Sequence, residues 1–120
     1  APAALHQGYL LKRSSSLLGD WKRRYFILDT AGALTYYRKS SRDGSLGAPQ
    51  ATVSLLTATI KPGTEDGAPG EQVRYSFRVV SPAKTYALQA DTEAERAGWM
   101  EAITVVISEL LNSTIGGGGV

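Results

Sequence analysis

Hydrophobic and polar residues alternate along most of the first 90 positions, in short runs separated by segments rich in Gly, Ser and Pro. Alternation with a period of two is typical of β-strands that bury one face. Aromatic and β-branched residues, which strands favour, are concentrated in the same runs. The pattern predicts seven strands, over residues 8–12, 21–29, 33–39, 51–56, 57–62, 73–80 and 84–90.

A change of period after residue 90 predicts one C-terminal helix. The stretch DTEAERAGWMEAITVVISELLNS, residues 91–113, places apolar side chains at helical spacing, and Thr92 with Glu95 forms a T-x-x-E capping box at its start. Gly98 costs the helix about 1 kcal/mol relative to Ala, and we expect it to let a strand approach closely. The face expected to be buried contains Ala94, Ala97, Met100, Ile103, Val106 or Ile107, and Leu110 or Leu111, with Trp99 at its edge.

Seven short strands followed by one helix predict the architecture. A flat sheet would leave an apolar face bare, whereas a curled sheet buries it. We therefore predict a mainly β fold: a seven-stranded antiparallel barrel of two near-orthogonal sheets, capped by one C-terminal α-helix. Trp99 is expected to close one end, and the loops after the first, third and sixth strands to surround the other. We expect a domain over residues 6–112, an N-terminal flank at 1–5 and a Gly-rich C-terminal linker at 113–120.

Composition argues against catalytic and metal sites. The 120 residues include no cysteine and one histidine, so a zinc site, thiolate chemistry and disulfides are not expected. There is no G-x-x-x-x-G-K-[ST] motif, and we read Glu65, Asp66 and Glu71 as a solvated loop. No apolar run approaches the roughly 20 residues of a transmembrane helix. We expect no enzyme activity, no cofactor and no metal, in a cytoplasmic setting that suits a chain without cysteine.

Charge is distributed unevenly along the chain, although the formal net charge is only +2. Residues 1–50 contain eight Lys and Arg against three Asp and Glu, giving +5, whereas residues 51–120 contain five against eight, giving −3. This asymmetry favours an anionic partner for the N-terminal half. A nucleic acid is not expected, because such a partner calls for a continuous basic face and a higher net charge.

Alternation along the first three strands brings several cations to one end of the predicted barrel. Lys22 and Arg24 share a face of the second strand, Lys12 ends the first, and Tyr36 and Arg38 share a face of the third. Cations so close together repel one another, and a multiply charged anion such as a phosphate group would relieve that repulsion. The alternative is that these are long side chains reaching solvent at the barrel rim.

The stretch GYLLKRSSSLLGDWKRRYFILD resembles the pleckstrin homology (PH) domain, and the resemblance covers residues 6–112. The strand order and the helix carrying Trp99 match the family. So does the basic signature of phosphoinositide-binding members: Lys12 ending the first strand, Lys22 and Arg24 in the second, and Tyr36 in the third. Within the family the chain is most similar to the PH domains of Arf GTPase-activating proteins of the BAR–PH–ArfGAP type.

The resemblance implies a phosphoinositide headgroup-binding, membrane-targeting module of a larger cytosolic signalling or trafficking protein. Such a module is cytoplasmic and peripheral on membranes, and an Arf-type small GTPase is an implied partner of the larger protein. The rival interpretation is a protein-interaction or autoinhibitory PH-fold domain without specific lipid binding. The implied headgroup ligands are Lys12, Lys22 and Arg24, supported by Tyr36, and the candidate set is completed by Arg13 and Arg38.

Two leucines, Leu17 and Leu18, stand side by side in the serine-rich segment between the first two strands. We interpret them as a loop that inserts into the membrane while the neighbouring cations hold a headgroup. The alternative is a local cluster in which they fold back on Trp21 or Tyr25.

Overall fold

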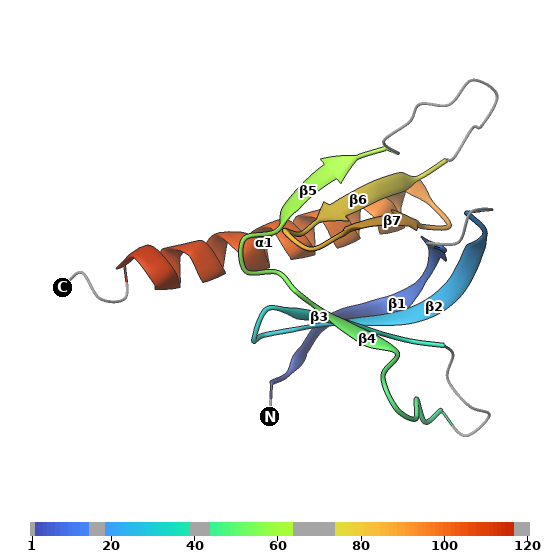
Figure 1. Ribbon diagram of the computed structural model, residues 1–120, viewed down its shortest axis with the longest axis horizontal. Coiled ribbons are helices and arrows are strands. Elements are labelled where there is room, and N and C mark those ends of the chain that lie inside the picture. The colour runs from blue at the N-terminus through green and yellow to red at the C-terminus, as the bar shows by residue number, and fades with distance from the viewer. Residues whose placement is uncertain (1, 15–18, 39–43, 64–73, 117–120) are drawn as a thin grey trace.

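Seven β-strands precede one long α-helix in the computed structural model (Figure 1), which describes residues 2–14, 19–38, 44–63 and 74–116. The elements are β1 (Ala4–Arg13), β2 (Trp21–Asp29), β3 (Ala33–Tyr37), β4 (Ala51–Ser54), β5 (Thr59–Pro62), β6 (Ser76–Val80), β7 (Thr85–Gln89) and α1 (Glu93–Gly116). The predicted mainly β, seven-stranded fold with a C-terminal helix is confirmed. Among the described residues, no helix combines the length and apolar character that a membrane span requires.

The seven strands form one antiparallel sheet in the order β4-β3-β2-β1-β7-β6-β5. Strands β1 and β7 share only two residue pairs, Leu11 with Gln89 and Lys12 with Leu88. In Figure 1 the strands β1 to β4 lie in one layer and β5 to β7 in another, with α1 behind the second. The two predicted sheets are therefore halves of one hydrogen-bonded sheet, joined at the C-terminal end of β1.

The observed ends of several elements differ from those predicted. Strand β1 begins at Ala4, four residues before the predicted start at residue 8, and α1 continues to Gly116. Strands β4 and β5 are shorter than predicted, because a turn separates them in which the Ala58 amide donates to the Leu55 carbonyl over 3.0 Å. The domain bounds of 6–112 stay a prediction.

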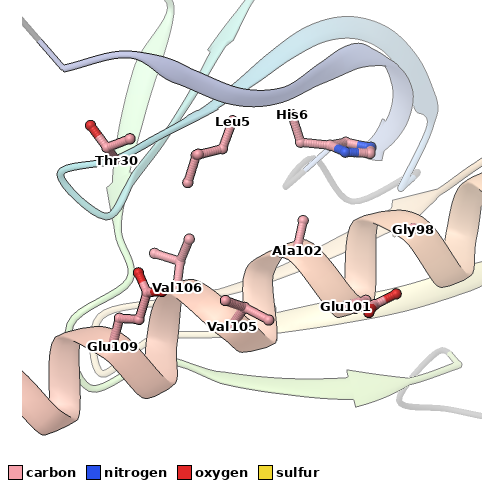
Figure 2. Close-up of a pocket in the computed structure, with 9 residues that line it drawn as sticks. All are labelled: Leu5, His6, Thr30, Gly98, Glu101, Ala102, Val105, Val106 and Glu109. Atoms are coloured by element: carbon pink, nitrogen blue, oxygen red, sulfur yellow. The ribbon is translucent and has the colours of Figure 1, made fainter.

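The helix packs beside the N-terminal half of β1, where His6 approaches Gly98 (Figure 2). A Cβ atom built on Gly98 would lie 3.6 Å from the His6 ring, which is ordinary van der Waals contact. The close approach predicted for Gly98 is therefore observed, but it does not strictly require glycine. At the start of α1 the Glu95 amide donates to the Thr92 hydroxyl over 3.1 Å, as the predicted cap requires.

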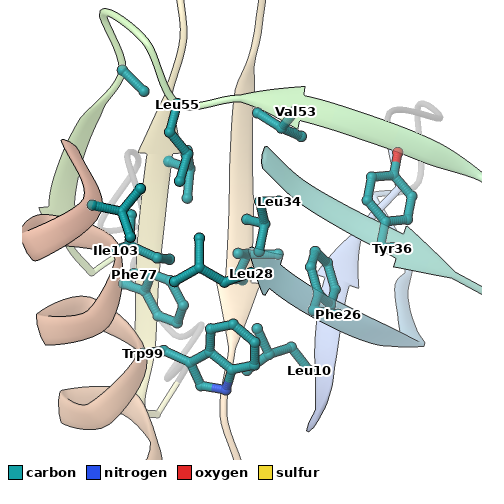
Figure 3. Packing of buried hydrophobic residues seen from close by; sticks show 14 of the residues in the cluster. Leu10, Phe26, Leu28, Leu34, Tyr36, Val53, Leu55, Phe77, Trp99 and Ile103 are labelled. Atoms are coloured by element: carbon teal, nitrogen blue, oxygen red, sulfur yellow. The ribbon is translucent and has the colours of Figure 1, made fainter. Parts of the chain in front are cut away.

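The core lies between the two halves of the sheet and α1 (Figure 3). Trp99 is 3% exposed and lies edge-on to His6, with ring centroids 4.4 Å apart, and to Phe26 at 6.4 Å. Trp99 therefore closes the end of the barrel that faces α1, as predicted. The largest side chains that are essentially inaccessible to solvent are Phe26, Phe77, Leu10, Leu28, Leu34, Leu55, Leu88, Ile103 and Val79.

The buried face of α1 differs from the prediction. Ala94 and Ala97 are exposed, whereas Trp99, Ile103 and Val106 are buried, so Trp99 lies at the centre of the face and not at its edge. The physical reason is size, because burying the indole removes far more apolar surface from water than burying two methyl groups.

Candidate functional site

Antiparallel pairing of β1 with β2 places two lysines directly opposite each other. Lys12 pairs with Lys22, and two residues further along the ladder Leu10 pairs with Arg24. Like charges in opposing positions of a sheet are destabilising. The cations at this end of the barrel therefore repel one another, and a bound anion would relieve that repulsion.

These side chains line one pocket of about 390 Å³ at the C-terminal end of β1. Five of the six predicted headgroup residues are brought together here, and three further residues join them. None of the described residues that line the pocket is acidic. The lining consists of Lys12, Ser14, Lys22, Arg24, Tyr36, Arg38, Gln50 and Lys84.

Arg24 is held in place by two hydrogen bonds. Its Nε donates to the side-chain oxygen of Gln50 over 2.8 Å, and a terminal guanidinium nitrogen donates to the Arg23 carbonyl over 2.8 Å. Both acceptors are neutral, so the positive charge is oriented without being neutralised. A guanidinium held in this way keeps its remaining N–H donors for a ligand.

Lys12 is half-buried between two tyrosine rings. Its Nζ lies 5.3 Å from the centroid of Tyr36 and 5.9 Å from that of Tyr86, within the range of cation–π attraction. Burial lowers the pKa of Lys12 below its usual value, and the positive charges of Lys84 and Arg24 lower it further. A bound anion would oppose all three effects, so Lys12 is poised to gain from anion binding.

Tyr36 is buried and lines the pocket, and Figure 3 shows its hydroxyl pointing away from the rings of Phe26 and Trp99. Burial raises the pKa of this hydroxyl, Tyr86 raises it further, and Arg24 partly offsets the rise. The hydroxyl therefore stays protonated at neutral pH and can donate a hydrogen bond to an anion.

Lys84 is the main pocket residue that the sequence reasoning missed. It follows the turn between β6 and β7, where its amide donates to the Ser81 hydroxyl over 3.1 Å. Its Nζ lies 5.1 Å from the Tyr86 centroid, on the same ring that Lys12 approaches. The sixth loop was expected at this opening, so a lysine at the end of that loop was a usable signal.

Arg13 does not line the pocket. Its guanidinium lies 5.9 Å from the ring centroid of Trp21 and packs over Gly19, where a built Cβ would come within 2.8 Å of the Arg13 Nε. Neighbouring residues of a strand point to opposite faces, so Arg13 is directed away from the side that carries Lys12. The predicted membrane-inserting residues Leu17 and Leu18 lie outside the described residues.

The chemistry of this pocket is that of polyanion binding. Lysine and arginine supply charged donors, Tyr36 a neutral one, and phosphate oxygens are their natural acceptors. Within the described ranges, no group of three His, Cys, Asp or Glu residues could hold a metal ion. Three of the cations, Lys22, Arg24 and Arg38, also border a second hollow beside Tyr9 and Arg23.

Curated proteins similar to this chain include two plant Arf GTPase-activating proteins. The chain is 38% identical to ADP-ribosylation factor GTPase-activating protein AGD3 of Arabidopsis thaliana, over 92% of this chain and 17% of that protein. It is 40% identical to AGD1 of the same plant, over 90% of this chain and 17% of that protein. The chain therefore spans about a sixth of the length of these relatives.

Solved structures of PH domains are similar to this chain in fold. The C-terminal PH domain of human pleckstrin is similar with a TM-score of 0.72 and 26% identity, covering 91% of this chain and 92% of that one. The C-terminal PH domain of pleckstrin in complex with D-myo-Ins(1,2,3,4,5)P5 is similar with a TM-score of 0.67 and 25% identity, covering 87% and 98%. The PH domain family model matches residues 4–108, from the first strand into the closing helix. The predicted resemblance is thus confirmed, and the chain belongs to the PH domain family.

Proposed function

We propose that this PH domain binds phosphoinositide headgroups and so brings the protein that carries it to membranes. The observation that carries the proposal is the pocket formed by Lys12, Lys22, Arg24, Arg38 and Lys84, five cations without a described acidic neighbour in the lining. Among the described residues, none of the five has an ion-pair partner. A ligand with several phosphates would supply the missing negative charge.

The pocket suits an inositol phosphate better than a single phosphate group. Its cations come from β1, from β2, from the position after β3 and from the position before β7, so they surround the opening from several sides. A ring carrying phosphates in several directions can contact them together, which one phosphate cannot. The pleckstrin PH domain solved with an inositol pentakisphosphate is a structural neighbour at 25% identity.

The role at the membrane follows from the same chemistry. A PH domain is a non-catalytic module, so we assign this chain recruitment and leave GTPase activation to other parts of the Arf-GAP relatives. We propose a cytoplasmic, membrane-peripheral location, and an Arf-type GTPase as a partner of the larger protein. Insertion of Leu17 and Leu18 beside the headgroup also belongs to this proposal.

Liposome sedimentation tests the function. Vesicles containing phosphatidylinositol mono-, bis- or trisphosphates are compared with phosphatidylserine vesicles of equal surface charge, so that specific and diffuse attraction are separated. We expect retention on at least one phosphoinositide that exceeds the phosphatidylserine control and that Lys12→Ala abolishes. Lys61→Ala removes an exposed lysine outside the pocket and is the matched control. Equal retention on both kinds of vesicle would contradict the proposal.

A further inference from the structure

A separate hollow, remote from the cationic pocket, lies between β1 and α1, and we call it the β1–α1 groove (Figure 2). Leu5 and His6 of β1 face Ala102 and Val106 of α1 across it, and Val105 lies beside them on the helix. The groove has a volume of about 510 Å³. That is room for a few apolar side chains of a bound partner.

An irregularity in β1 helps to build the groove. The pairing of β1 with β2 shifts between Ala4, which pairs with Asp29, and His6, which pairs with Leu28. Leu5 is the additional residue, and the bulge allows the consecutive residues Leu5 and His6 to line the same hollow. A regular strand would direct them to opposite faces. Bulges of this kind re-aim side chains and often accompany functional surfaces.

The walls of the groove expose large apolar side chains. Leu5 is 51% exposed and Val105 is 49% exposed, although both are branched aliphatic residues. Because they lie on two different elements and border one hollow, a partner that enters it would remove both from water.

Two carboxylates make the groove negatively charged. Glu101 and Glu109 line it from the helix, and no described Lys or Arg lines it. They are eight residues apart on α1, which corresponds to about 12 Å along the axis. In the part of the chain that the structure describes, neither glutamate has an ion-pair partner. The groove is therefore complementary to a partner that is apolar at its centre and basic at its ends.

The same charges argue against a lipid occupant. Anionic lipid surfaces and fatty-acid headgroups are repelled by two unneutralised carboxylates. Leu5 also lies seven residues before Lys12 on β1, which places the groove about 23 Å from the cationic pocket along an extended strand. A partner at the groove would leave that pocket open.

We propose that the β1–α1 groove docks a segment of a partner protein, with two or three apolar side chains seated between β1 and α1 and Lys or Arg residues at its edges that pair with Glu101 and Glu109. This binding is independent of lipid binding, and both ligands can be held together.

A displayed library of random peptides, selected on the immobilised domain, tests the proposal. Selected peptides are synthesised, and their dissociation constants are measured by fluorescence anisotropy against the wild-type domain and variants. We expect enriched sequences that combine apolar residues with Lys or Arg. The double variant Leu5→Ser with Val105→Ser should weaken their binding by about tenfold or more. Glu101→Gln with Glu109→Gln should weaken it several-fold, with a smaller dependence on salt.

Matched measurements make the result decisive. The variants alter half-exposed or exposed side chains, and thermal unfolding near the wild-type midpoint would show that they fold. Lys12→Ala should leave peptide binding unchanged, and a saturating inositol polyphosphate should change it by no more than about twofold. Enrichment of acidic peptides, peptides indifferent to the groove variants, or a failure to enrich any sequence would each overturn the proposal.

Discussion

Lys12 of β1 lies directly opposite Lys22 of β2, and its ammonium group sits between the rings of Tyr36 and Tyr86. The two cations repel each other, while the two rings attract the ammonium group of Lys12. The ligand-free domain thus holds Lys12 in an environment that disfavours its charge on balance, since burial and neighbouring cations lower the pKa.

Replacing Lys12 should therefore stabilise the ligand-free domain. Lys12→Met keeps the aliphatic length and removes the charge, so we expect an unchanged or higher free energy of unfolding at neutral pH. Because the pKa is lowered in the folded state, the unfolded chain binds this proton more tightly, and wild-type stability should rise with pH between the lowered pKa and 10.5. Urea denaturation of both proteins across this window checks the difference. A less stable Lys12→Met protein would contradict it.

Tyr86 is expected to act as a positioning residue for two cations. Its ring lies within 5.9 Å of the Lys12 ammonium and 5.1 Å of the Lys84 ammonium. Tyr86→Phe keeps the ring and should bind an inositol polyphosphate as the wild type does. Tyr86→Leu removes the ring face and should weaken binding by roughly five- to thirtyfold, about 0.5–1 kcal/mol for each of the two cation–π contacts. Titration of the Lys12 ammonium by NMR gives a second readout, because only the loss of the ring should shift it. Equal affinities of the Tyr86→Phe and Tyr86→Leu variants would contradict a positioning role for the ring.

Trp99 is expected to be a residue of the fold. It is 3% exposed and contacts both His6 and Phe26. Trp99→Ala should lower the free energy of unfolding by about 3–5 kcal/mol, because the surrounding side chains cannot fill the cavity. Chemical denaturation measures the loss. A midpoint close to that of the wild type would show that α1 does not close the barrel.

Two glycines should respond oppositely to the same substitution. Gly32 has a φ of +84°, and a Cβ there would come within 2.6 Å of the Leu110 side chain, so Gly32→Ala should destabilise the domain by at least about 1 kcal/mol. Gly98 lies inside α1, and a Cβ atom there would lie 3.6 Å from the His6 ring, an ordinary van der Waals contact. Gly98→Ala should therefore stabilise the domain by up to about 1 kcal/mol. Thermal unfolding measures the midpoint of each variant. A shift of both midpoints in the same direction would contradict this prediction.

The part of the site that follows from strand alternation could be predicted from the sequence. A period of two determines that Lys22 and Arg24 share a face and that Tyr36 and Arg38 share another, and the structure brings all four to one pocket. The turn after β2 is likewise formed by local contacts, since the Asp29 carboxylate accepts the amides of Ala31 and Ala33 at 2.9 and 3.1 Å.

The features that escaped prediction depend on contacts between distant segments. Lys84 lines the pocket beside Lys12 through the pairing of β7 with β1, and the place of the sixth loop at this opening is the one sequence signal that points to it. The bulge at Leu5 depends on the register of β1 with β2, whereas the sequence alone predicts only a flank over residues 1–5. Apolar side chains project from most sides of α1, so the pattern alone does not determine which side faces the core. The packing of the Trp99 indole determines the rotation of the helix. Alternation also argues against Arg13, which the candidate set nevertheless included.

The most direct test of the central claim is isothermal titration calorimetry of the domain with inositol 1,3,4,5-tetrakisphosphate, for the wild type, Arg24→Ala and Arg74→Ala. Arg24 lines the pocket, whereas Arg74 is exposed and lies outside it, so the two variants remove the same charge from different places. We predict that Arg24→Ala costs about 1.5–3 kcal/mol of binding free energy, or roughly 10- to 150-fold in affinity, without loss of stability, and that Arg74→Ala has little effect. Equal affinity for Arg24→Ala and the wild type would contradict the assignment of the pocket.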